Sequence, residues 1–317
     1  MLYDCHAHIL NIDYVPDECV GIDLPFSKKL MNKISNILHN IWPFSDDDYL
    51  DNISAFEKNM SQTQEENYIE LASKYPYLNC ICIVQMDFYS VKGNEKIPYE
   101  MQLLEGLAVR NKFGRDKVKL FMGIDPNTPY YDYLIEKYID IIDGVKIYPP
   151  LNSIPTHDNF NKLWQICEKK QIPVTAHCGP NAAITAPIFR NPVAAEFANP
   201  KNWRKVLEKY PLLKVNLAHF GSGDEEWEKT IISLMYRFPS VYTDTAYSIA
   251  TDARMARYRN WLDDSVFRRR LLFGSDYFIS NMENKSFEKC LKRAKDFLGD
   301  DGFVLAAIEN PRKFLTP

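Results

Sequence analysis

Short apolar segments rich in β-branched residues alternate along the chain with longer segments whose apolar residues recur at helical spacing. The strand candidates are residues 2–10, 78–87, 118–125, 141–148, 172–178, 213–219, 240–246 and 270–276. Helix candidates follow the later strands at residues 158–170, 201–210, 224–237, 252–269, 283–298 and 302–315. This alternation predicts a parallel sheet whose strands are joined by helical crossovers.

The number of strands distinguishes two parallel-sheet folds. Eight strands, each followed by a helix, close a TIM (β/α)8 barrel, whereas an open doubly wound sheet usually has fewer strands and a glycine-rich phosphate turn. No GxGxxG sequence follows any strand candidate. Residues 11–60 are too long for an ordinary connection, so we expect a helical insertion after strand 1, near the barrel mouth. We expect one barrel domain over residues 1–317, although the length alone also admits two small domains.

Composition and charge exclude several classes of protein. The 38 basic and 42 acidic residues are spread along the chain without a basic block, so we expect no nucleic-acid partner. No apolar run is long enough to span a bilayer and no secretory leader is evident, which favours a cytoplasmic protein with no membrane contact. The seven cysteines form no CxxC pair, so we expect free thiols. A small-molecule substrate is the expected partner, and a homodimer stays open.

Two histidines lie close together in the first predicted strand. His6 and His8 are two residues apart, and side-chain alternation places them with Asp4 on one face and turns Cys5 toward the helices. Two imidazoles on one face can converge on one metal ion. An isolated HxH sequence is common, however, and by itself it favours an ordinary polar pair on a solvated face.

Further ionisable residues occupy the ends of other predicted strands. His177 and His219 each end a strand candidate, and Asp276 ends the eighth, at the barrel end where active sites are built. Four of the six histidines therefore fall at strand ends. A charged Asp pointing into a barrel mouth is costly unless it is paired or binds a metal. Imidazole and carboxylate are normal ligands of Zn²⁺, so we expect a divalent metal ion, with Zn²⁺ favoured.

Six segments carry a resemblance to a known family. They are DCHAHIL at 4–10, GVKIYPP at 144–150, TAHCG at 175–179, NLAHFG at 216–221, VYTDTA at 241–246 and FGSDYF at 273–278. In this order they resemble the amidohydrolase superfamily, and more narrowly its amidohydrolase-2 branch of hydrolases and aminocarboxymuconate-semialdehyde-type decarboxylases. The resemblance implies that His6, His8, His177 and Asp276 bind a single metal ion. It also implies that His219 is catalytic and that Asp276 doubles as the base that takes a proton from water.

Three residues are candidate substrate contacts. In binuclear members of the superfamily a lysine on strand 4 is carboxylated and bridges two metals, but this branch is usually mononuclear. We therefore expect an uncarboxylated Lys146 to hold a substrate carboxylate or an oxyanion, with a structural ion pair as the alternative. Arg190 lies in the long segment 179–200, and Tyr148 lies at the end of strand 4. For these two, a solvated loop cation and ordinary aromatic packing are the alternatives.

Three functions fit these residues. The first is hydrolysis, in which activated water attacks the carbonyl of an amide, lactone or ester on a small carboxylate-bearing substrate. The second is non-oxidative decarboxylation of an unsaturated or aromatic acid, which uses the same ligands but needs a cationic anchor for the carboxylate. The third is a barrel that binds a ligand without catalysis. No implied ligand position is replaced in this chain, which favours an enzyme.

Overall fold

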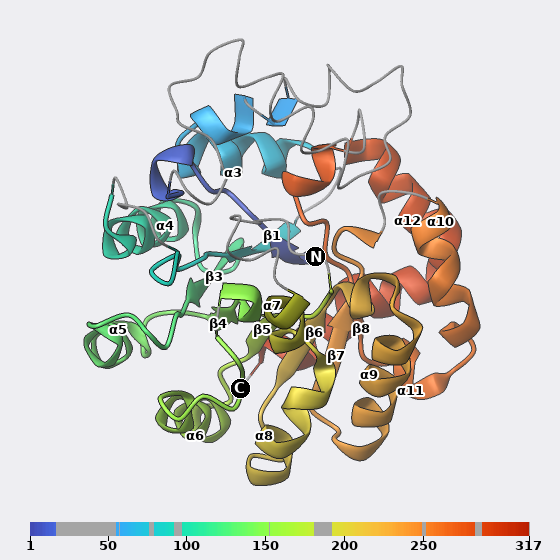
Figure 1. Ribbon diagram of the computed structural model, residues 1–317. Coiled ribbons are helices and arrows are strands. Elements are labelled where there is room, and N and C mark those ends of the chain that lie inside the picture. The colour runs from blue at the N-terminus through green and yellow to red at the C-terminus, as the bar shows by residue number, and fades with distance from the viewer. Residues whose placement is uncertain are drawn as a thin grey trace.

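A closed ring of strands forms the centre of the molecule (Figure 1). The computed structural model describes residues 1–16, 55–56, 58–75, 79–91, 97–151, 153–180, 192–248, 252–282 and 287–316. The strands are all parallel and follow one another in sequence order: β1 (Leu2–Ala7), β2 (Asn79–Val84), β3 (Val118–Gly123), β4 (Gly144–Ile147), β5 (Val174–His177), β6 (Val215–Ala218), β7 (Val241–Asp244) and β8 (Leu271–Leu272). Each predicted strand contains one of them, so the predicted TIM barrel is confirmed.

Backbone hydrogen bonds between β1 and the segment that begins with β8 close the ring. The Cys5 amide donates to the Phe273 carbonyl at 2.8 Å, and the Asp276 amide donates to the His6 carbonyl at 2.8 Å. Asp276 therefore lies beside His6 although 270 positions of sequence separate them. The closure therefore places the first quoted motif, at residues 4–10, beside the last one, at residues 273–278.

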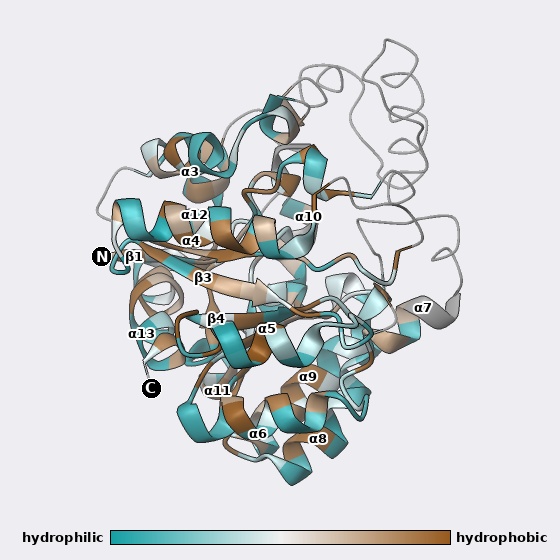
Figure 2. Cartoon of the chain, turned by 90° about the vertical axis from the view of Figure 1, so that its left-hand side faces the viewer, coloured by the Kyte–Doolittle hydropathy of each residue, from teal (hydrophilic) through white to brown (hydrophobic). Residues whose placement is uncertain are grey.

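Helices surround the ring of strands (Figure 1). They are α3 (Gln64–Ser73), α4 (Tyr99–Phe113), α5 (Tyr131–Tyr138), α6 (Phe160–Lys170), α7 (Pro192–Phe197), α8 (Trp203–Lys209), α9 (Glu225–Arg237), α10 (Asp252–Met255), α11 (Ser265–Arg268), α12 (Phe287–Val304) and α13 (Asn310–Leu315). Figure 2 shows that α5, α6 and α8 carry both hydrophobic and hydrophilic residues, as helices packed on one face do. Among the described residues, no helix combines the length and apolarity that crossing a bilayer requires.

Three predicted elements differ from the structure or fall outside it. The helix predicted over 302–315 is formed by the end of α12, a π-helical segment (Leu305–Glu309) and α13. The helix predicted over 252–269 is divided into α10, a 3-10 segment (Ala256–Trp261) and α11. Asp264 explains the last division, because its side chain accepts hydrogen bonds from the amides of Val266 and Phe267 and so begins a new helix. Most of the predicted insertion, residues 17–54 and 57, lies outside the described residues.

A β-bulge in β1 changes which side chains face the barrel interior. Asp4 pairs with Ile81 and Ala7 pairs with Ile83, so the two residues between them share a single partner position. As a result His6 and Cys5 both face inward. The prediction that alternation turns Cys5 toward the helices was wrong, because alternation fails at a bulge.

Asp4 is displaced from the predicted face by the same bulge. Its carboxylate accepts hydrogen bonds from the Tyr75 hydroxyl at 2.5 Å and the Ser275 hydroxyl at 2.6 Å. Tyr75 belongs to the helical layer, where its ring packs edge-on against Phe287 of α12. Asp4 is therefore a structural residue on the helix side of β1. The prediction that it shares a face with His6 was wrong.

An apolar group of side chains, here called the basal cluster, fills the barrel interior around one aromatic ring. Its buried members are Cys5, Cys82, Val84, Phe121, Tyr242, Leu272 and Phe314. Phe314 comes from α13, and its ring centroid lies 6.5 Å from that of Phe121 on β3 and 5.1 Å from that of Tyr242 on β7. Because β3 and β7 lie on opposite sides of an eight-stranded ring, Phe314 fills its centre. Figure 2 shows α13 and both termini at one end of the barrel and α7 at the other.

Candidate metal centre and active site

Three of the four expected metal ligands meet at the barrel mouth. His6 and His8 come from β1 and the residue after it, and Asp276 lies four residues beyond β8. The Asp276 Oδ1 atom is 3.3 Å from His8 Nε2 and 3.9 Å from His6 Nε2. One potential ligand atom from each residue lies within 4.8 Å of those of the other two, and all three residues are buried. This spacing suits three ligands of one ion.

His177, the fourth expected ligand, and His219 adjoin this group. The His219 ring centroid is 5.1 Å from that of His6 and 4.7 Å from that of His177. The His177 Nε2 atom is buried and has no hydrogen-bond partner within the described part of the chain. Burial, reinforced by the neighbouring His219, holds the pKa of His177 well below its ordinary value. His177 is therefore neutral, and its buried Nε2 atom is available at the site.

Asp244, at the end of β7, orients His6. The His6 Nδ1 atom is 2.9 Å from Asp244 Oδ2, and since a carboxylate only accepts, Nδ1 carries the proton. The opposite nitrogen, Nε2, then has the free lone pair that a metal ligand needs. Burial alone would raise the pKa of Asp244, but the contact with His6 holds it well below its usual range.

The Asp244 carboxylate also organises the neighbouring strand. Its Oδ2 atom accepts a 2.7 Å hydrogen bond from the Asn216 amide of β6, and its Oδ1 atom accepts a 2.8 Å bond from the His219 backbone N–H. Sequence reasoning missed both Asp244 and Asn216 as site residues, although both lie in quoted motifs. A charged residue at the end of a short apolar strand was the signal for Asp244.

A backbone carbonyl orients the His219 ring. Its Nδ1 atom is 3.2 Å from the Ala246 carbonyl, which can only accept, so Nδ1 donates and Nε2 is the reactive nitrogen. The backbone at His219 has φ 68°, and Asp276 has φ 53°. Such left-handed conformations are uncommon for residues with a side chain and typically concentrate at functional sites. The fold holds both side chains in orientations that an ordinary strand end would not give.

Lys146, from β4, is buried against the proposed ligand set. Its Nζ atom is 3.1 Å from His6 Nε2, so the lysine donates to the same lone pair that a metal would use. Burial lowers the pKa of Lys146 to about 8. Tyr148 lies nearby, with its ring centroid 4.7 Å from that of His177. Arg190, the other expected substrate contact, lies outside the described residues.

The chemistry of these donors fits a divalent cation. Burial, together with the Lys146 charge, lowers the pKa of His6 to about 3, and burial also lowers the pKa of His8. Burial alone would raise the pKa of Asp276, but the hydrogen bond with His8 and the nearby imidazoles hold it well below its usual range. The site therefore offers neutral imidazole nitrogens and one ionised carboxylate, the ligand types that Zn²⁺ takes.

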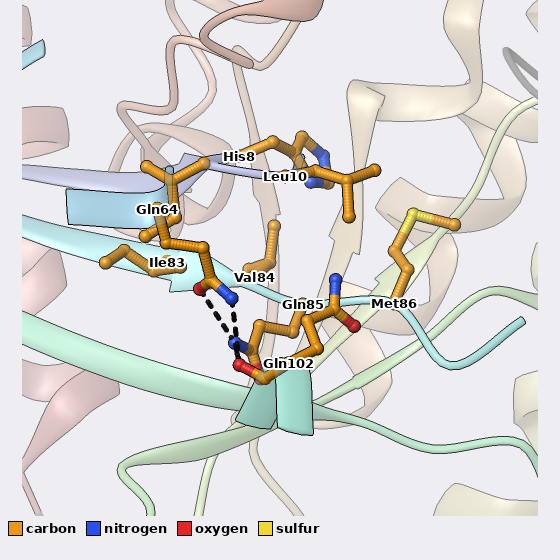
Figure 3. Close-up of a pocket in the computed structure, with 9 residues that line it drawn as sticks. His8, Leu10, Gln64, Ile83, Val84, Gln85, Met86 and Gln102 are labelled. Carbon is orange, nitrogen blue, oxygen red and sulfur yellow. Dashed lines mark hydrogen bonds between the residues drawn. The ribbon is translucent and has the colours of Figure 1, made fainter. Parts of the chain in front are cut away.

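A small pocket opens beside His8 (Figure 3). It has room for about one water-sized group. It lies between β1, β2, α3 and α4, and its lining is His8, Ile9, Leu10, Gln64, Ile83, Val84, Gln85, Met86 and Gln102. The pocket therefore shares a wall with the candidate metal centre.

A sequence model of the Amidohydrolase family matches residues 141–315, which is more than half of the chain. The chain belongs to the amidohydrolase family. The expected resemblance is confirmed, and the matched part of this amidohydrolase includes His177, His219 and Asp276. Members of the family are generally metal-dependent. No curated protein matches the sequence.

Solved structures similar to this amidohydrolase include both hydrolases and decarboxylases. A probable 2-pyrone-4,6-dicarboxylic acid hydrolase from Acinetobacter baumannii, solved with citric acid bound, has a TM-score of 0.64 at 14% identity, over 99% of this chain and 98% of that one. The 5-carboxyvanillate decarboxylase from Sphingomonas paucimobilis has a TM-score of 0.60 at 10% identity, over the same shares. An amidohydrolase from Burkholderia multivorans with bound zinc has a TM-score of 0.57 at 9% identity, over 87% and 96%. At these identities the likeness establishes a common fold, which serves both reactions.

Proposed function

We propose that the protein is a metal-dependent hydrolase that cleaves an amide, lactone or ester in a small carboxylate-bearing substrate. One observation carries this proposal: potential ligand atoms of His6, His8 and Asp276 lie within 4.8 Å of one another, next to the unpartnered Nε2 of His177. We assign these four residues as ligands of one divalent ion, with Zn²⁺ favoured. An ion held there would polarise a carbonyl and activate water for attack.

The other side chains divide the proton transfers between them. Asp276 remains ionised because its pKa is held low. It could take the proton of a water whose acidity a bound ion would raise. His219 has its Nδ1 committed to the Ala246 carbonyl, so Nε2 is the atom that exchanges a proton with the reacting group. Lys146 supplies a buried cation for a substrate carboxylate or an oxyanion, and Tyr148 lines the same side. Arg190 stays a proposed substrate contact.

Decarboxylation of an unsaturated or aromatic acid is the second candidate. Lys146 favours it specifically, because a buried amine 3.1 Å from a ligand nitrogen could anchor the departing carboxylate. In this reaction His219 would first take a proton from water at Nε2 and then deliver it to the substrate carbon as CO₂ leaves. The two reactions therefore use the same side chains and differ in product.

Product analysis separates these candidates. The purified protein is analysed for metal, then screened with lactones, amides, esters and aromatic acids, scoring hydrolysis products and CO₂ separately. We expect about one equivalent of a divalent metal and hydrolysis that a chelator stops and added Zn²⁺ restores. Metal-dependent CO₂ release without hydrolysis would select the decarboxylase. Protein that binds metal and turns over no compound in either class would favour a barrel that only binds its ligand.

A further inference from the structure

The pocket beside His8 has two chemically different walls. Apolar side chains from Ile9, Leu10 and Val84 form one part, and three buried glutamines form the other. Figure 3 shows the glutamines gathered across the pocket from His8 and Leu10. Gln64 comes from α3, Gln85 follows β2 and Gln102 comes from α4, so three separate elements contribute a polar group to one place.

Hydrogen bonds fix the orientation of the Gln85 amide. Its Nε2 atom donates to Gln64 Oε1 at 3.1 Å and to the Gln102 backbone carbonyl at 2.9 Å. Because a backbone carbonyl only accepts, nitrogen must face it, and the amide cannot be turned over. The Gln85 Oε1 atom is buried and finds no hydrogen-bond partner among the described residues. A buried acceptor without a hydrogen bond lowers the stability of the fold. A ligand that donates a hydrogen bond to this atom would remove that penalty.

A glycine in α4 makes room for this arrangement. A Cβ atom at Gly106 would lie 2.4 Å from Gln85 Nε2 and 3.2 Å from Gln64 Oε1. Glycine within a helix is unfavourable relative to alanine, so its presence there needs a reason. Here the missing side chain is what allows the two amides to meet inside the fold.

We propose that this pocket admits a single polar group of the substrate, next to the reacting carbonyl, and that Gln85 Oε1 accepts a hydrogen bond from that group, a neutral hydroxyl or amide N–H. The proposal rests on the proposed function, since His8 is both a pocket wall and an assigned metal ligand. The pocket's described lining contains no Lys, Arg, Asp or Glu. Burying an anion or an ammonium there would lack a counter-charge, so a neutral donor is selected.

Matched metal-binding probes test this assignment without turnover. Butanohydroxamate and its 2-, 3- and 4-hydroxy derivatives are titrated calorimetrically into the Zn²⁺-loaded protein. The hydroxamate end binds the ion, and the hydroxyl samples three distances toward Gln85. We expect at least one hydroxylated probe to bind about 10- to 100-fold more tightly than butanohydroxamate, the usual effect of satisfying a buried polar group.

Variants identify the acceptor. Gln85→Met keeps the side-chain length and removes the amide, so the preference for the hydroxylated probe should disappear. Gly106→Ala should also reduce it, by displacing the Gln85 amide, and it serves if Gln85→Met does not fold. Gln62→Met is the matched control. Gln62 is a partly buried glutamine just before α3, and it does not line the pocket. It should retain the wild-type preference.

The outcomes distinguish the two proposals. If all probes bind with equal affinity, the pocket assignment is wrong while the metal centre stands. If Gln85→Met keeps the wild-type preference, the hydroxyl binds elsewhere and the assignment is again wrong. If no hydroxamate binds to the Zn²⁺-treated protein, the metal centre fails and this inference fails with it.

Discussion

The mouth and the base of the barrel are built from the same strands but have opposite chemistry. On β1 the inward Cys5 belongs to the apolar basal cluster, whereas the next residue, His6, faces the metal centre. On β7 the inward Tyr242 packs against Phe314, and two residues later Asp244 accepts a hydrogen bond from His6 Nδ1. On both strands, therefore, a residue of the basal cluster and a residue of the metal centre are only one or two positions apart.

This contrast shows where stability is gained and where it is lost. The base buries aromatic and aliphatic surface, which is the main favourable term in folding. The mouth buries neutral histidines, among them His177 with an unpartnered nitrogen. It also contains residues whose backbone is in the left-handed conformation, such as His219. Each of these features reduces stability. We therefore expect substitutions at the mouth to affect activity and those at the base to affect folding.

Asp276→Asn should have the largest effect on activity. The amide keeps the volume but removes the charge and the base, so turnover should fall to below roughly 10⁻⁴ of the wild-type value. The fold should stay intact, because the substitution removes no packing. Rates and melting curves on one preparation test both halves of this expectation. Activity near the wild-type rate with metal bound would rule out the proposed role of Asp276.

His219→Asn should retain the metal and lose rate. His219 is assigned to the reacting group, since three imidazoles and one carboxylate with water already complete a four- or five-coordinate ion. Acid–base help from one side chain is worth about 10² to 10⁴ in rate, so kcat should fall within that range. Metal content is measured on the same sample. Loss of metal would show that His219 is a ligand, and a second ion beside Lys146 would then need to be considered.

Phe314→Ala should show the opposite pattern, at the base. Its ring is fully buried between Phe121 and Tyr242, so truncation leaves a cavity at the barrel centre. Removing a buried Phe side chain costs about 3–5 kcal/mol in the free energy of unfolding. Chemical denaturation should show this loss, while kcat and metal stoichiometry of the folded fraction stay near wild type. A selective loss of kcat without loss of stability would contradict the division between base and mouth.

The strand count and the barrel were predictable because alternation of strands and helices is a strong periodic signal. Positions where single side chains depart from this periodicity were not predictable. Side-chain alternation placed Asp4 with His6 and turned Cys5 outward, but the bulge in β1 reverses both assignments. A bulge depends on how β1 pairs with β2, which is information that the residues of β1 alone do not contain.

The candidate site was predictable to the extent that its residues end strands. His6, His8, His177 and Asp276 stood out for this reason, and the structure brings them to one end of the barrel. The glutamine pocket gave no such signal, because Gln64, Gln85 and Gln102 are uncharged and belong to three elements far apart in sequence. Only the packing of α3 and α4 against the end of β2 brings the Gln85 amide to the Gln64 amide and to the Gln102 backbone carbonyl.

Asp244→Asn tests a residue that only the structure identifies, and it should have the smallest of these effects. The Asn side chain can present its oxygen to the His219 backbone N–H and its NH₂ group to His6 Nδ1. His6 would then accept at Nδ1 and carry its proton on Nε2, where the metal lone pair is required. Loss of such an outer carboxylate typically costs about 10- to 100-fold in metal affinity. Competition with a chromogenic zinc chelator measures this directly, and excess Zn²⁺ should restore much of the lost activity. Asn216→Ala is the matched control, because it removes another hydrogen bond to the same carboxylate and leaves the His6 tautomer unchanged. Equal metal affinity in wild type and Asp244→Asn would show that His6 Nε2 is not a ligand, and the assigned coordination set would have to be revised.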